Sequence, residues 1–85
     1  MKKTFRECES VYLVFTGKEA DEEIYEMLLF RIEEEENSEQ ATLVTDSGRL
    51  VVDKQELDLT EIHYDTGANL FTDRTTAENW HKKNK

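Results

Sequence analysis

Proline is absent from this chain, glycine occurs three times and cysteine once. Without a second cysteine, neither an internal disulfide nor a zinc site built from several cysteines can form. No stretch approaches the roughly 18 consecutive apolar residues that a membrane-spanning helix needs. The basic start at Lys2 and Lys3 is not followed by an apolar segment long enough for a signal peptide. We therefore expect a cytoplasmic protein without a membrane partner.

Residues suited to catalysis are equally scarce. The histidines are His63 and His81, and neither the serines nor the cysteine lies in a sequence typical of a nucleophile turn. Cys8 stands between Glu7 and Glu9, whose negative charges would raise the pKa of a thiol rather than activate it. The three glycines lie too far apart to form a phosphate-binding loop. This pattern predicts that the protein is not an enzyme.

Two weak metal-binding patterns occur around residue 65. In a strand, His63 and Asp65 would point to the same side and could offer a nitrogen and a carboxylate to one ion. Asp65, Gly67 and Asn69 have the spacing of part of a calcium loop, but the acidic residue that closes such a loop is missing. Turn formation accounts for both patterns. We expect no metal and no cofactor.

The charge balance is strongly acidic. Twenty acidic residues stand against 11 basic ones, for a formal net charge of -9, and residues 18–39 hold ten of the acids and two of the bases. Such a chain repels nucleic acid and anionic membranes, so we expect a protein partner, with a basic one favoured. A solvated surface that serves solubility is the alternative interpretation. The candidate partner-binding residues form two clusters: Glu19, Asp21, Glu22 and Glu23, then Glu33, Glu34, Glu35 and Glu36.

The length of 85 residues predicts one domain over residues 1–85. Only 36% of the residues are hydrophobic, which predicts a small core that self-association into a homo-oligomer could supplement. High charge favours disorder. Apolar runs at residues 11–15, 27–32 and 50–52 favour an ordered core instead.

Two long segments carry most of the strand prediction. Residues 10–15 are strand-favouring types throughout and predict a first strand covered on both faces. Residues 24–32 fit a helix and a strand equally well, since either template places four apolar residues among five on one face. We favour the strand, because its second face would hold Tyr25, Met27 and Leu29 together, as a central strand beneath a helix does.

The remaining strand signals are shorter. They predict, in chain order, a polar connection at 33–40, a hairpin of strands 41–45 and 49–52 around a three-residue turn, a short strand at 62–64 and a turn at 65–69.

The C-terminal end predicts a helix over about residues 74–83. Thr72 or Asp73 can supply the N-cap, and lysines in the last turn complement the helix dipole. Residues 70–71 would staple the helix entry. Trp80 lies on the helical face that would anchor this helix to the core.

The pattern Phe-Thr-Asp-Arg-x-x-Ala-Glu-x-Trp at residues 71–80 resembles the ending of small uncharacterised proteins of Gram-positive bacteria, their phages and mobile elements. The resemblance implies a β-meander followed by a short helix and assigns no activity and no functional residue. Together with the strand and helix predictions, it leads to an α+β fold. We expect a small antiparallel β-meander, able to curl into a barrel, with a C-terminal helix.

Two functions fit these features. The first is that of a small acidic accessory protein that binds a protein partner and does not catalyse a reaction. The alternative is a DNA-mimic inhibitor of a nucleic-acid-binding host protein. If residues 24–32 form a strand, the acidic clusters at its two ends would stand roughly 30 Å apart and could imitate spaced phosphates.

Overall fold

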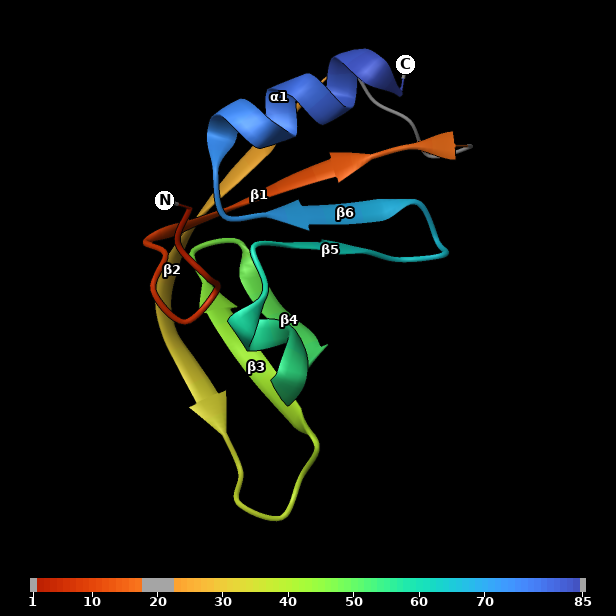
Figure 1. Ribbon diagram of the computed structural model, residues 1–85. Helices are drawn as coiled ribbons and strands as arrows, with labels where there is room; N and C mark the ends of the chain where they lie inside the picture. Colours follow the sequence, from red (N-terminus) through yellow and green to blue (C-terminus); the bar gives the residue numbers. More distant parts are fainter. Residues whose placement is uncertain (1, 18–22, 85) are drawn as a thin grey trace.

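Strands make up most of the fold, which ends in an α-helix (Figure 1). The computed structural model describes residues 2–17 and 23–84, so Glu19, Asp21 and Glu22 of the first acidic cluster lie outside the described residues. The elements are, in chain order, β1 (Ser10–Phe15), β2 (Tyr25–Glu34), β3 (Gln40–Thr45), β4 (Gly48–Asp53), the 3-10 helix η2 (Lys54–Asp58), β5 (Glu61–His63), β6 (Ala68–Phe71) and α1 (Arg74–Lys83).

The strands form one antiparallel sheet in the order β4-β3-β2-β1-β6-β5. The first four strands are a meander. The chain then leaves β4 at one edge, passes through η2 and enters β5 at the opposite edge, and β6 returns to pair with β1. The sheet curls into a half-barrel, and α1 lies across it beside β1 and β6 (Figure 1). The predicted α+β fold with a barrel-like sheet and a C-terminal helix is confirmed.

The ambiguous segment at residues 24–32 is a strand, as favoured. β2 pairs with β1 on one side and with β3 on the other. Met27 is buried in the core and Leu29 packs against it, while a bulge at Phe30 shifts the register against β3. Pairing with β3 carries the strand through Glu33 and Glu34. These two acids therefore belong to the sheet and not to the predicted polar connection.

The predicted hairpin of β3 and β4 forms, but its turn has two residues, Asp46 and Ser47, and not three. Gly48 already pairs with Thr45 at the start of β4. Its φ of 130° is a backbone conformation that suits glycine. The turn is tied to β2 because the Leu28 N–H donates to Asp46 Oδ1 at 3.0 Å.

The prediction is wrong at residues 68–71, which form β6 rather than a turn and the helix entry. All of these residues but Ala68 are buried. A strand covered on both faces shows no alternation of polar and apolar residues, so its sequence gives a weak strand signal. The polar Asn69 weakens this signal further. The neighbouring strand predicted at 62–64 is present as β5, one residue earlier, and the Tyr64 N–H donates to the Ala68 carbonyl across the short turn.

The core has two parts, one on each face of β1, as expected for a strand covered on both sides. The larger part lies inside the half-barrel, and its buried residues are Phe5, Cys8, Val11, Met27, Ala41, Leu43, Val52, Leu57, Ile62 and Leu70. The smaller part lies between α1 and the sheet and consists of Val14, Phe71 and Ala77, with Tyr12, Ile24 and Trp80 packed against them.

The start of α1 follows the predicted capping chemistry. Asp73 is the N-cap, since its Oδ2 accepts the Thr76 N–H at 2.9 Å. Thr72 has another role, donating its hydroxyl to the carbonyls of Lys3 and Thr60. Within the described ranges, the helices are too short and too polar to cross a membrane.

Candidate functional site

The half-barrel is open along one side. Its two edge strands are β4 and β5, and each pairs with a strand on one side only among the described residues. The chain crosses from one edge to the other through η2 rather than through strand pairing (Figure 1). Core side chains fill the interior, and the β4 edge faces the open side.

An apolar groove of about 250 Å³ lies at the opening. It runs between the inner side of β1 and β6 and the edge strand β4. Its lining residues are Leu13, Phe15, Leu50, Val51, Tyr64, Ala68 and Leu70. Val51 is 58% exposed although it is a β-branched apolar residue in a strand. An apolar groove next to an exposed apolar side chain is a feature of binding surfaces.

Among the described residues that line this groove, Tyr64 is the one with a polar side-chain group. Its hydroxyl oxygen is buried and has no hydrogen-bond partner among the described residues. Burial raises the pKa of Tyr64 to about 12, and the carboxylates of Glu56 and Asp53 add to the rise. The hydroxyl therefore stays protonated at neutral pH, and because it is buried, the surface that the groove offers to a partner is mainly apolar.

The β4 edge offers unpaired backbone groups beside the groove. In a two-residue hairpin the residues next to the turn form a hydrogen-bonded pair, so the backbone groups of Gly48, Leu50 and Val52 face β3. Those of Arg49 and Val51 face the free side. No backbone bond to these groups is found in the part of the chain that the structure describes. Such an edge is a template for another strand.

The second acidic cluster, Glu33 to Glu36, is partly neutralised by arginines. Glu33 pairs with Arg49 at 2.7 Å and with Arg31 at 3.1 Å. These arginines, Arg31 first, lower the pKa of Glu33. Glu35 and Glu36 are exposed at the turn between β2 and β3. Glu23 is described and exposed, but the rest of its cluster lies outside the described residues.

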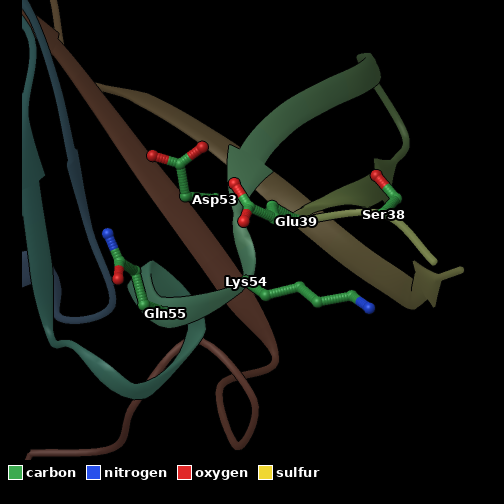
Figure 2. Close-up of a pocket in the computed structure, with 5 residues that line it drawn as sticks. All are labelled: Ser38, Glu39, Asp53, Lys54 and Gln55. Carbon is green, nitrogen blue, oxygen red and sulfur yellow. The ribbon is translucent and has the colours of Figure 1, made fainter. Parts of the chain in front are cut away.

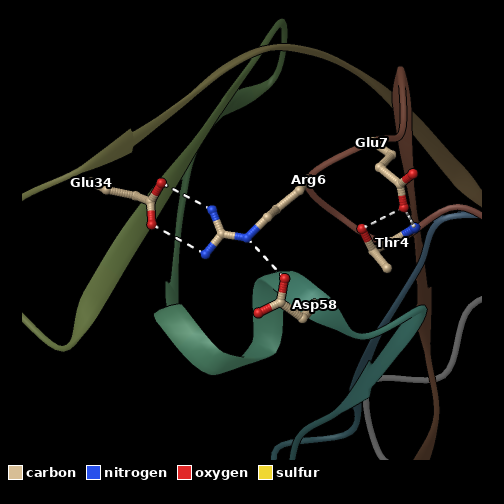
Figure 3. Close-up of polar contacts among 5 residues, drawn as sticks. All are labelled: Thr4, Arg6, Glu7, Glu34 and Asp58. Carbon is tan, nitrogen blue, oxygen red and sulfur yellow. Dashed lines mark hydrogen bonds and ion pairs between the residues drawn. The ribbon is translucent and has the colours of Figure 1, made fainter.

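Glu34 has a structural role (Figure 3). Its carboxylate accepts both terminal nitrogens of Arg6, at 3.0 and 3.3 Å, and the Arg6 Nε donates to Asp58 at 2.9 Å. Beside this contact, the Thr4 N–H and hydroxyl donate to Glu7. The N-terminal segment is thereby fastened to β2 and η2. These groups are exposed, so solvent screens each pair and its contribution to stability is small.

A second hollow, of about 400 Å³, lies beside the start of η2 (Figure 2). Its lining is polar and consists of Ser38, Glu39, Asp53, Lys54 and Gln55. The Lys54 ammonium group points away from Asp53 and donates to the Glu35 carbonyl. The side chains do not converge on a common point, so the hollow shows no arrangement for catalysis.

The residues considered for catalysis have structural contacts. Cys8 is buried and its thiol donates to the Phe5 carbonyl at 3.5 Å. The pKa of this thiol is raised, as expected, but the cause is burial and not the flanking carboxylates. A protonated, buried thiol is a poor nucleophile.

His63 forms part of the sheet instead of a metal site. Its Nδ1 lies 2.7 Å from Asn69 Oδ1 and its Nε2 lies 3.1 Å from Glu61 Oε1, while its ring stacks on Trp80 with centroids 4.2 Å apart. The Asn69 amide donates to the Val14 and Gly67 carbonyls. No group of three or more metal-ligating side chains occurs among residues 2–17 and 23–84.

Comparison with protein-family models, curated proteins and solved structures finds no match to this chain. The site is therefore interpreted from its own geometry. The acids can be selected from the sequence, but the groove cannot, because its residues are separated by up to about two thirds of the chain length, from Leu13 to Leu70. Val51 carries the one local signal, since it belongs to the run of three apolar residues at 50–52 in β4, the last strand of the meander.

Proposed function

We propose that this protein is a non-enzymatic, cytoplasmic protein-binding module that takes up an extended segment of a protein partner along β4. The observation that carries the proposal is the free β4 edge beside an apolar groove. A strand added to this edge would hydrogen-bond to the backbone of Arg49 and Val51. Every second side chain of that strand would enter the groove beside Leu50.

Electrostatics favour a basic residue in the partner segment near the end of β4. Asp53 closes the strand and is exposed, and Glu35 and Glu36 lie exposed at the adjoining turn. The net charge of -9 would speed the approach of such a partner at low salt. The groove and the backbone supply affinity, and the carboxylates supply selectivity.

The DNA-mimic function receives less support. Glu33 and Glu34 are held in ion pairs with arginines of the same chain. Their charges are therefore partly compensated before any partner arrives, and within residues 2–17 and 23–84 no ion pair is found for Glu35 or Glu36. Two neighbouring carboxylates reproduce only a small part of the row of negative charges that a phosphate backbone presents.

The test is partner capture from the native cell with a Val51→Pro variant. Proline removes the Val51 N–H, which points to the free edge, and proline is tolerated on edge strands for this reason. The control is Val51→Thr, which keeps both the N–H and the β-branched shape. We expect a partner that binds the wild type and the Thr variant and is lost with the Pro variant, followed by confirmation with the purified partner.

A partner that binds the Pro variant as tightly as the wild type would contradict strand addition. In that case, binding at 50 and 300 mM salt should be compared for wild type and Glu35→Lys/Glu36→Lys. Affinity that falls steeply with salt and is lost in the lysine variant would transfer the binding site to the acidic turn and support mimicry.

A further inference from the structure

The free edge of β4 carries a charge pattern that complements itself. Arg49, Val51 and Asp53 are alternate residues of the strand, so their side chains lie on one face. The Arg49 side chain is 60% exposed and Val51 is 58% exposed. A base that also pairs with Glu33 at 2.7 Å therefore stands at one end of the edge, an acid at the other, and an exposed apolar residue midway between them.

We propose that a second copy of this chain adds its own β4 to this edge, antiparallel, around a two-fold axis that passes beside Val51. The proposal rests on the strand-addition function above and names the segment that is added. Two-fold symmetry places Val51 opposite Val51 of the second copy. It then places Arg49 opposite Asp53 of the second copy, and Asp53 opposite its Arg49.

The same register pairs most of the backbone groups on the free side of β4. The N–H and C=O groups of the edge residues Arg49 and Val51 point to the free side. The two Val51 residues would exchange N–H to carbonyl bonds, and the Arg49 N–H would donate to the Asp53 carbonyl of the second copy. The Asp53 N–H already donates to Glu56 Oε1 at 2.8 Å, so the Arg49 carbonyl of the second copy gains this donor only when the Glu56 side chain moves aside.

The rest of the outer sheet face extends this complementarity. Arg31 pairs with Val44 in β3, which pairs with Arg49 in β4, so the two arginines lie in one row across the sheet. Glu35 lies near the other end of the face, in a shallow hollow that Val51 also lines. The two-fold axis would bring the basic row of one copy beside the acidic end of the other. A register shifted by two residues would leave these charges unmatched.

Charge exchange provides the main test. Arg49→Asp alone would place two aspartates opposite each other at each end of the paired strands, and Asp53→Arg alone would place two arginines there. An equimolar mixture of the two variants restores opposite charges at both positions. We expect a wild-type dimer in sedimentation equilibrium, a dissociation constant raised about tenfold or more for each single variant, and recovery of the dimer in the mixture. Native mass spectrometry should show that the recovered dimer contains one copy of each variant.

A disulfide trap tests the position of the axis. Directly opposite residues in a hydrogen-bonded antiparallel pair have Cα atoms about 5.5 Å apart, a distance that a disulfide spans. Val51→Cys should therefore form a covalent dimer rapidly under mild oxidation. Leu59→Cys is the matched control, since Leu59 is 48% exposed and lies outside β4. Cys8 is buried and does not compete.

Wild-type protein that stays monomeric at millimolar concentration overturns the self-pairing, as does a mixture of the charge variants that fails to associate although both variants are folded by circular dichroism. Equal trapping rates for Val51→Cys and Leu59→Cys would also overturn it. These outcomes are separate from those of the proposed function. A monomeric protein whose partner is lost with Val51→Pro would still bind by strand addition.

Discussion

Removing the Trp80 side chain should loosen α1 from the sheet, because this ring joins the two. Trp80 packs against the smaller core part, stacks on His63 with centroids 4.2 Å apart, and lies 6.1 Å from the ring of Phe71. The helix otherwise contributes the buried Ala77, whose methyl group covers little surface. The perturbation is Trp80→Ala.

The magnitude follows from three contributions. Truncating a buried aromatic residue to alanine costs about 3–5 kcal/mol. Trp80 is only half-buried, so the cost of its truncation lies at the lower end, about 3 kcal/mol. Loss of ring stacking adds about 1 kcal/mol. The Trp80 Nε1 is buried without a hydrogen-bond partner among the described residues, so its removal returns about 1 kcal/mol. The expected loss in the free energy of unfolding is about 3 kcal/mol.

The assay is urea unfolding followed by circular dichroism, because Trp80 is the one tryptophan and its fluorescence is lost with it. With a slope of about 1 kcal/mol per molar urea, the midpoint should fall by about 3 M. Trp80→Phe is the control, since it keeps a ring and removes the unpartnered N–H, and should cost less than about 1 kcal/mol. A loss below about 1 kcal/mol for Trp80→Ala would refute the anchoring role and make the ring available as a binding residue.

Two further substitutions test local geometry. Asp73→Ala should cost about 1 kcal/mol at pH 7 by removing the helix cap. The Thr76 N–H lowers the pKa of Asp73 in the folded state, so its contribution is present above the unfolded carboxyl pKa of about 4. The difference in melting temperature between the wild type and Asp73→Ala should therefore shrink as the pH falls through the lowered pKa that Asp73 has in the folded state. Gly67→Ala should cost about 2 kcal/mol or more in the same melts, because φ is +92° and a Cβ would sit 2.4 Å from the Thr16 carbonyl oxygen. Gly17→Ala, with φ of +75° and no described atom within 4 Å of the added Cβ, should cost less, and an equal cost would contradict the steric argument.

Predictions from local sequence were accurate where the physical cause is local. The β3–β4 hairpin follows from strand-favouring residues around a turn that Gly48 directly follows, and the start of α1 follows from Asp73 bonding to a nearby N–H. The β2 segment fits helix and strand alike by periodicity. Pairing with β1 and β3 settles it as a strand, because tertiary contacts outweigh weak intrinsic preferences.

The candidate site was predicted least well. The acids can be counted in the sequence, but their partners cannot, since Glu34 meets Arg6 across 28 positions of the chain. The groove is assembled from β1, β4, β6 and Tyr64. These parts come together because the chain crosses from β4 to β5 at the opposite edge of the sheet, from which β6 returns to pair with β1. The crossing has no local signature.

The sequence by itself determined the small size, the acidic charge, the first strand, the hairpin and the capped helix, because composition and bonds between near neighbours decide these features. Only the tertiary structure decided which strands have a neighbour on one side alone. The free β4 edge depends on the order in which distant segments pair, and β6 fills the place beside β1 that would otherwise be the edge. That order follows from burying both faces of β1 at once, inside the half-barrel and beneath α1, and burial on two faces is a property of the whole chain.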